Sequence, residues 1–582
     1  MKNLLTLKKY FAVYKVKLFW GFIFIILSNA GSLYIPLLIK DAINALQKSA
    51  ASGVLLRYAF IILATSLFAG VFRFFIRQTI IVVSREIEYD LRHNFWKHIQ
   101  LLPLRYFQNN STGNIMAHAT NDINAVRMFI GPAVMYSIDT SISLLIIIPI
   151  LISLNLPLTI YSLLPLPFLS YAVYRVGKLI HKKFTLIQEK FSELTTMAQE
   201  NYAGIRVVKS YVREESEIGL FKNLSNDYVK RNMEMIKVQA FIMPILFLIT
   251  GLSLIIVVWL GGLKVIRHEM DLGQIAAFIV YLGELIWPMI AFGWVTNIIQ
   301  QAEASMKRLN KIFAEPYEIN DSPATDYSIK EIKGKIEFRN VSFRYGVNSP
   351  YILKNIDLDI QQGQTIALMG YTGSGKTSFI NLIPRMYDVS EGSLLIDGVN
   401  IKNIPLEILR TNIGLVQQES FLFSDTILNN ISYGLREIDR QKVEEVSRIA
   451  NFDKDVESFP VGYDTIMGER GITLSGGQKQ RASLARSLAI DPRIIILDDS
   501  FSAVDTNTEE SILRNLKLFM KNRTSIIISH RISTVKDADL IIVLSEGIIA
   551  EKGTHDDLVK LNGIYADLHY KQLLEKELEE LN

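Results

Sequence analysis

The stretch Gly370–Thr377 has the residue types and the spacing of a phosphate-binding loop. Its sequence, GYTGSGKT, fits the pattern G-x-x-x-x-G-K-[ST] between an apolar run and a helical stretch. Glycines let backbone N–H groups turn toward phosphate oxygens, and the N-terminus of a helix adds its dipole. We expect Lys376 to reach the β- and γ-phosphates and Thr377 to bind Mg²⁺. The predicted phosphate contacts are Gly370, Thr372, Gly373, Ser374, Gly375, Lys376, Thr377 and Ser378.

Two further motifs follow this loop along the chain. Ile494–Asp498 is an apolar run that ends in an acid, where a second Mg²⁺ anchor is expected. Leu474–Gln478, with the sequence LSGGQ, lies between that run and the loop. From about Lys333 onward, short β-branched runs alternate with amphipathic stretches, which is typical of an α/β domain. The phosphate-binding loop therefore lies in the expected context, between a predicted strand and a predicted helix.

Together, these motifs make the chain resemble a half-transporter of the ATP-binding cassette (ABC) exporters. Members of this family fuse a six-helix transmembrane domain to one α/β nucleotide-binding domain, the cassette, which has a P-loop NTPase fold. Leu474–Gln478 matches the family's signature motif without a mismatch. The resemblance implies ATP and Mg²⁺ as ligands, and a dimer in which each ATP lies between the phosphate loop of one cassette and the signature of the other. Ser475, Gly476, Gly477 and Gln478 would then bind nucleotide across the dimer.

The resemblance also implies roles for single residues. Tyr345 would stack on adenine, although a core tyrosine is the alternative. Gln418 would contact Mg²⁺ together with Thr377 and Asp498. His530, which follows the apolar run 525–529, would contact the γ-phosphate, with a purely structural histidine as the alternative.

Asp499 departs from the family pattern. A glutamate, the catalytic base, normally follows the acid at position 498, and Asp499 is one methylene shorter. A general base must lie within about 2.6–3.2 Å of the water that it polarises, so the shorter side chain matters. Asp499, His530 and Gln418 form the predicted catalytic set. An aspartate here is typical of heterodimeric exporters with one impaired site; a homodimer that tolerates aspartate is the alternative.

Composition and charge agree with a membrane protein joined to a soluble domain. The chain has 582 residues, 49% of them hydrophobic and only 21% charged, against about 25% charged in a typical soluble protein. Its net charge of +4 is too small to indicate nucleic-acid binding, and with no cysteine it has no disulfides or thiolate metal sites. A bilayer core needs about 20 apolar residues per helix, which predicts six spans. They are expected near residues 16–39, 54–84, 128–154, 157–178, 238–263 and 272–302.

The distribution of basic residues predicts the orientation. Lys and Arg gather at the N-terminus and in segments 85–127 and 175–237, whereas the connection near Asn155 is uncharged. Basic loops stay in the cytoplasm, so both termini and the cassette should be cytoplasmic in a multi-pass plasma-membrane protein of a bacterium. The expected domains are a transmembrane domain at 1–312, a polar linker at 313–332, and a nucleotide-binding domain with a C-terminal helix at 333–582.

The long cytoplasmic segments also resemble those of ABC exporters. Tyr106–Gly113 and Asn201–Glu215 resemble the family's two intracellular loops, whose short coupling helices dock on the cassettes. The coupling turns are expected near 112–121 and 203–210. The second turn would reach the cassette of the partner subunit.

The sequence says less about the transported compound. Charges within the spans usually face the bundle or a wet cavity, so Arg73 and Arg77 could contact substrate or pair with Asp139 or Glu284. Aromatic residues suited to a lipophilic ligand, or equally to packing, are Phe278, Trp287, Phe292 and Trp294. We predict ATP-driven export of a small lipophilic or amphipathic compound. Lipid or peptide export, or a regulatory subunit that hydrolyses little ATP, are the alternatives.

Overall fold

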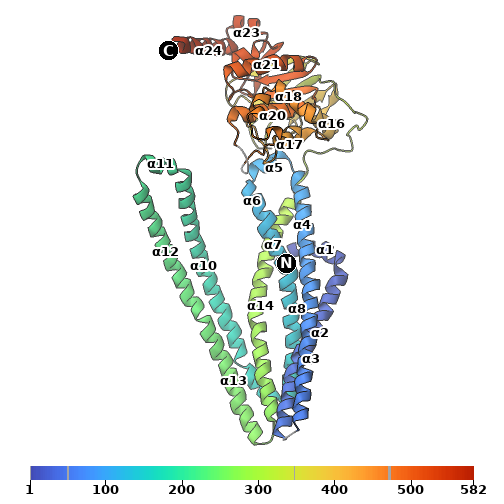
Figure 1. Cartoon of the computed structure of the whole chain (residues 1–582), viewed down its shortest axis with the longest axis vertical. Coiled ribbons are helices and arrows are strands. Elements are labelled where there is room, and N and C mark those ends of the chain that lie inside the picture. The colour runs from blue at the N-terminus through green and yellow to red at the C-terminus, as the bar shows by residue number, and fades with distance from the viewer. Residues whose placement is uncertain (1, 49–50, 347, 469–472, 582) are drawn as a thin grey trace. The chain divides into compact units, whose positions relative to one another are not determined.

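The computed structural model describes residues 2–48, 51–346, 348–468 and 473–581, which divide into two compact units (Figure 1). The membrane unit runs to Gln100 and again from Thr112 to Glu315. The cassette unit contains the short segment Leu101–Ser111 and the chain from Pro316 onward. The two units agree with the predicted combination of an all-α membrane domain and an α/β nucleotide-binding domain.

The membrane unit is entirely helical. Among the described residues, six helical stretches are long and apolar enough to cross a membrane, which confirms the predicted number. The helices, with short 3₁₀ and π turns (η), are η1 (Asn3–Leu7), α1 (Lys8–Val13), α2 (Lys15–Gln47), α3 (Ser52–Ile76), η2 (Arg77–Ile81), α4 (Val82–Gln100), α6 (Thr112–Ala117), η3 (His118–Asp122), α7 (Ile123–Met128), η4 (Phe129–Ala133), α8 (Val134–Leu154), α9 (Leu156–Leu163), α10 (Leu166–Ala203), α11 (Ile205–Ser210), α12 (Glu214–Ala240), α13 (Ile242–Ile266) and α14 (Leu272–Phe313).

The break between the third and fourth spans lies at Asn155. Its backbone is extended, and its side-chain oxygen accepts the N–H of Leu158 at 3.0 Å, as an N-cap does. Pro157 follows within the first turn of α9, where a missing N–H breaks no helical hydrogen bond. The extended backbone of Asn155 therefore ends the third span, and its side-chain cap together with Pro157 begins the fourth.

Helices α10, α11 and α12 form a hairpin (Figure 1), and Leu166 and Leu169 at the start of α10 lie in the buried core of the membrane unit. No residue of α11 or α12 is buried. Large apolar side chains lie exposed along the hairpin, among them Phe191, Tyr211, Phe221 and Ile236. Phe191 contacts Tyr228 of α12, with ring centroids 5.9 Å apart, while about half of its side chain stays exposed.

The short helix of the first intracellular loop is α5 (Leu104–Asn109), which belongs to the cassette unit. It begins after Pro103, whose backbone is extended, and ends at Asn110. Arg105 reaches Glu318 at 3.6 Å on the cassette side. The region expected to hold this turn, 112–121, contains helix α6 and the π turn η3, and α5 lies just before it.

The cassette unit has two sheets. An antiparallel sheet has the order β2-β1-β4-β5, and a six-stranded sheet, parallel except at its β10 edge, has the order β10-β9-β3-β8-β7-β6. The strands are β1 (Ile336–Phe343), β2 (Leu353–Ile360), β3 (Thr365–Met369), β4 (Glu391–Ile396), β5 (Val399–Asn400), β6 (Ile413–Val416), β7 (Ile494–Asp498), β8 (Thr524–Ile528), β9 (Leu540–Ser545) and β10 (Ile548–Gly553). The helices and 3₁₀ turns are α15 (Lys376–Leu382), η5 (Ile401–Asn403), α16 (Leu406–Thr411), α17 (Ile427–Ile431), η6 (Ser432–Gly434), α18 (Arg440–Ile449), α19 (Asp453–Glu457), η7 (Gly462–Asp464), α20 (Gly476–Ala489), α21 (Thr506–Met520), α22 (Ile532–Val535), α23 (His555–Leu561) and α24 (Ile564–Leu581).

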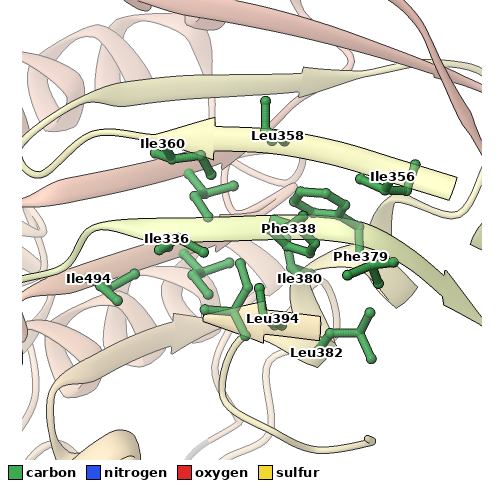
Figure 2. Packing of buried hydrophobic residues seen from close by; sticks show 14 of the residues in the cluster. Ile336, Phe338, Ile356, Leu358, Ile360, Phe379, Ile380, Leu382, Leu394 and Ile494 are labelled. Carbon is green, nitrogen blue, oxygen red and sulfur yellow. The ribbon is translucent and has the colours of Figure 1, made fainter. Parts of the chain in front are cut away.

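A buried apolar core fixes the helix that follows the phosphate-binding loop. Phe379 of α15 stacks on Phe338 of β1, with ring centroids 4.3 Å apart. Ile380 and Leu382 enter the same core, together with Leu394 of β4 (Figure 2). All five side chains are 2% exposed or less, so α15 is held along its length and cannot tilt without opening the core.

The orientation across the membrane can be tested with introduced cysteines, because the chain has none. Leu156 lies at the predicted external turn and Tyr211 at the predicted cytoplasmic turn, and both side chains are at least half exposed. We expect Leu156→Cys, but not Tyr211→Cys, to react with an impermeant maleimide in intact cells. Both should react after permeabilisation, which controls for accessibility. Labelling of Tyr211→Cys in intact cells would contradict the orientation.

Candidate functional site

Most of the residues predicted to bind the nucleotide and Mg²⁺, apart from those of the signature, gather around one pocket of about 320 Å³ in the cassette unit. It lies at the ends of β3, β7 and β8, where an α/β sheet commonly binds ligands. Its lining residues are Tyr345, Ile352, Thr372, Gly373, Gly375, Lys376, Thr377, Ser378, Gln418, Asp498, Asp499, Ile528 and His530. The structure thus brings together residues that are up to 185 positions apart, from Tyr345 to His530 (530 − 345).

The loop needs glycine where it leaves β3. Gly370 has φ of 140°, and a Cβ there would lie 2.2 Å from the carbonyl oxygen of Leu544. No other residue fits this position without moving β9. Close by, the hydroxyl of Ser374 is buried without a hydrogen-bond partner among the described residues. A phosphate oxygen is an acceptor that this hydroxyl could donate to.

Lys376 is a buried cation. Its side chain donates to the carbonyl oxygens of Gly370 and Tyr371, at 2.9 and 3.0 Å. Burial lowers the pKa of this ammonium, while Asp498 and Asp499 act in the opposite direction. A buried cation that is coordinated mainly by neutral carbonyls attracts an anion strongly, which is the chemistry expected for phosphate binding.

Thr377 and Asp498 lie together as a candidate Mg²⁺ site. The Thr377 hydroxyl donates to Asp498 Oδ2 at 3.2 Å, and Gln418 lines the same pocket. Burial raises the pKa of Asp498, against the effect of the Thr377 hydrogen bond. Mg²⁺ prefers hard oxygen ligands from one or two protein groups plus substrate phosphates, so these residues fit the ion.

Tyr345 is half-buried at the edge of the pocket. Its hydroxyl shares a hydrogen bond of 2.8 Å with Ser378, and its ring meets that of Tyr387 edge-on at 5.2 Å. The ring is therefore fixed in orientation while part of it stays exposed at the pocket. Such a ring can both pack in the domain and stack on a base.

Asp499 is held by its backbone at the end of β7. Its N–H donates to the carbonyl oxygen of Ile528 at 3.0 Å, and its own carbonyl oxygen accepts the Ser502 hydroxyl at 3.1 Å. Its φ of 47° is in the left-handed region, which is uncommon for a residue with a side chain. The reach of its carboxylate is thus set by side-chain length alone.

The signature residues do not line the pocket. Ser475 is the N-cap of α20 and forms a capping box with Gln478: its hydroxyl accepts the Gln478 N–H at 3.3 Å, and Gln478 Oε1 accepts the Ser475 N–H at 2.9 Å. The Gln478 side-chain nitrogen donates to Asp455. Both ends of this amide are therefore bonded within the chain, whereas Ser475 and Gly476 are exposed.

Gln480 is a residue that the motifs do not contain. It is 6% exposed; its Nε2 donates to the Ser502 hydroxyl at 3.1 Å, and its Oε1 accepts the Ala503 N–H at 3.1 Å. Gly477 packs on the same segment, since a Cβ there would lie 2.8 Å from the Ala503 carbonyl oxygen. A buried glutamine two positions after a motif gives no sequence signal, because its partners lie on another loop.

Comparisons with known proteins agree with this geometry. Residues 18–289 match the family described as ABC transporter transmembrane region, and residues 353–502 match the family ABC transporter. The chain is 34% identical to the probable multidrug resistance ABC transporter ATP-binding/permease protein YheI of Bacillus subtilis, over 97% of each chain. This chain belongs to the ABC transporter family.

Other relatives place the transporter among the exporters. It is 32% identical to the ATP-dependent lipid A-core flippase of Desulfotalea psychrophila, over 96% of this chain and 97% of the flippase. It also matches a solved bacterial Atm1-family ABC exporter with ATP bound, with a TM-score of 0.78 and 26% identity over 96% of this chain and 99% of that chain. The chain is therefore an ABC exporter half-transporter, a multi-pass membrane protein that couples ATP hydrolysis to export. Such exporters act as dimers.

The charges in the spans of this transporter do not form the ion pairs considered above. Asp139 accepts a hydrogen bond of 2.6 Å from the side chain of Asn29 on α2. Within the described ranges, no salt bridge joins Arg73 or Arg77 to Asp139 or Glu284. The partner of Asp139 is thus a neutral amide.

The site predicts the effect of removing the buried cation. Lys376→Ala should weaken ATP binding at this chain's phosphate loop by at least about tenfold, because a charge-assisted hydrogen bond is worth about 1.5–3 kcal/mol. Photolabelling of the chain with an azido-ATP, competed by unlabelled ATP, measures this affinity. Lys521→Ala, at an exposed lysine after α21, is the matched control. Unchanged affinity in Lys376→Ala would contradict the assignment.

Proposed function

We propose that this chain is the subunit with the impaired site in a heterodimeric ABC exporter of a lipophilic or amphipathic compound, in the plasma membrane of a bacterium. Each cassette would bind ATP and Mg²⁺, and hydrolysis would take place mainly in the site completed by this chain's signature. Within this chain, Lys376, Thr377, Asp498, Gln418 and His530 hold the nucleotide and its metal. Tyr345 stacks on the adenine.

The observation that carries the proposal is the backbone position of Asp499. The hydrogen bonds to Ile528 and Ser502 fix the main chain on both sides of the residue. A carboxylate that is one C–C bond shorter than that of glutamate then falls about 1.5 Å short of the water. Both hydrogen bonds oppose a backbone shift that would make up this distance, so we expect this chain's own site to lose most of its general-base catalysis.

The dimer follows from two features of the described residues. The signature at the start of α20 lies outside the pocket that the phosphate loop lines, so each chain contributes halves of two different sites. The hairpin of α10–α12 exposes large apolar side chains that a second half-transporter would cover. The intact signature indicates that this chain completes its partner's site.

The class of compound is supported by the relatives and by the aromatic residues of the bundle. Relatives are named for multidrug resistance and for lipid A-core flipping. Tyr136 of α8 contacts Trp287 and Trp294 of α14 edge-on, at 6.0 and 5.4 Å. Phe292 is 76% exposed, whereas Phe278 is fully buried and so is a packing residue. The exposed rings suit an apolar ligand.

The asymmetry predicts which variants stop turnover. Ser475→Ala should lower ATP turnover of the co-purified pair by roughly 100-fold, the usual effect of removing one positioned donor from the reacting group. Asp499→Glu should change it only slightly, because hydrolysis in the proposed pair already takes place mainly in the other site, which this chain's signature completes. ATPase assays on the pair in lipid nanodiscs measure both.

The control for Ser475→Ala is Thr554→Ala. Thr554 forms a capping box with Asp557 at the start of α23, so this variant loses the same kind of helix cap away from the predicted site. The asymmetric proposal is wrong if this chain alone turns over ATP as fast as the pair. It is also wrong if Asp499 is needed for turnover and the partner's glutamate is not.

The second candidate function, a regulatory subunit that binds ATP and hydrolyses little, is favoured by the same Asp499. The regulatory subunit and the proposed exporter predict different results for one variant, Lys376→Ala. A regulatory subunit requires ATP at its own phosphate loop only to gate the partner, so Lys376→Ala would abolish gated transport but leave the partner's basal ATPase intact. In the exporter proposed here, transport and ATPase fall together.

A further inference from the structure

The C-terminal helix α24 contacts the segment that carries His530. We define Ser529–Thr534 as the switch segment. The side-chain oxygen of Gln572 accepts the N–H of Ile532 at 2.8 Å, and its nitrogen donates to the carbonyl oxygen of His530. One side-chain amide thus holds the backbone on both sides of Arg531. None of the nucleotide motifs contains Gln572.

The switch segment is also held from α21. Glu509 is 3% exposed, and its carboxylate accepts hydrogen bonds from the Arg531 guanidinium and, at 2.6 Å, from the Thr534 hydroxyl. Within the segment, the Ser529 hydroxyl accepts the Arg531 N–H at 3.0 Å. The segment is therefore held from two helices, through its backbone by Gln572 of α24 and through its side chains by Glu509 of α21. The His530 side chain is exposed at the nucleotide pocket.

Helix α24 has its own anchors beside the phosphate loop. Glu551 of β10 accepts the N–H of Tyr565 at 3.0 Å, and the Tyr565 ring is fully buried in a cluster with Met369, the last residue of β3. The Tyr371 hydroxyl, in the loop itself, donates to Asp567 at 3.3 Å. The same helix therefore contacts the phosphate loop and the switch segment.

We propose that Gln572 is a positioning residue for His530, and that α24 thereby sets how strongly this chain's own site prefers ATP to ADP. The inference rests on the proposed contact of His530 with the γ-phosphate, which ADP lacks. Without Gln572, the backbone at residues 530 and 532 loses two hydrogen bonds, and ordering the imidazole on the phosphate costs more entropy. Lys376 and Tyr345 lie on other elements and keep their contacts.

The test compares nucleotide affinities in the full-length transporter in lipid nanodiscs. Azido-ATP photolabelling of this chain is competed by a non-hydrolysable ATP analogue and, separately, by ADP. The variants are Gln572→Ala, Gln572→Glu, which keeps an acceptor for Ile532 but loses the donor to His530, and His530→Ala as reference. Tyr570→Ala, at a 64% exposed position two residues earlier on α24, is the matched control.

We expect Gln572→Ala to lower affinity for the ATP analogue by about three- to tenfold and to leave ADP affinity unchanged, in keeping with the net value of one or two hydrogen bonds. Gln572→Glu should show the same selective loss, and Tyr570→Ala none. In the His530→Ala background, Gln572→Ala should cause no further change, because the two residues act through one contact. Equal losses for both nucleotides, no loss, or additive losses would overturn the inference.

Hydrogen exchange separates failure of this inference from failure of the proposed function. The amide of Ile532 should exchange faster in Gln572→Ala than in Tyr570→Ala, whatever His530 does. If His530→Ala itself leaves the ATP preference unchanged, the γ-phosphate role of His530 is wrong, and with it the nucleotide-preference part of the inference. If His530→Ala lowers that preference while Gln572→Ala changes neither the preference nor the exchange, the role of Gln572 is wrong and the proposed function stands.

Discussion

The buried ammonium of Lys376 is the constraint on which the nucleotide site depends. A cation that is 9% exposed and bonded to two neutral carbonyls is costly unless an anion compensates it. Lys376 stays buried because its helix, α15, is held in place. Phe379 is stacked on Phe338, and the buried residues of α15 pack against strands of both sheets. The free energy lost by burying the cation is recovered when phosphate binds, so the site favours a nucleotide over water.

The phosphate loop could be proposed from the sequence alone because its chemistry is local. Gly370, Lys376 and Thr377 act through backbone conformation and side-chain type over eight residues, so their pattern is visible without the fold. Asp498 was predictable for a related reason, since an acid that ends an apolar strand lies at the edge of a sheet. The six spans were equally visible, because the thickness of a bilayer sets their length.

Other features could not be predicted because they depend on contacts between distant elements. Gln480 and Gln572 each hold backbone groups of another loop, and neither residue type indicates this role. Helix α5 lies just before the region expected for the coupling turn, because Pro103 precedes a new helix and Thr112 already begins α6. A helical pattern shows that helices are present, but not which turn between them packs on another domain.

A continuous set of short contacts connects the signature to His530 within one cassette. Gln480 of the signature helix holds Ser502 and Ala503, and the same loop ends at Asp505, the N-cap of α21. One turn later, Glu509 binds the switch segment.

In the proposed dimer, the signature serves the partner's nucleotide and His530 faces this chain's own, so these contacts would join the two sites through α21. Spatial continuity alone does not demonstrate energetic coupling. The physical basis for coupling here is the burial of Glu509, since a buried carboxylate cannot lose Arg531 or Thr534 without a large desolvation penalty. A shift of residues 502–505 that moved α21 would therefore carry the switch segment with it.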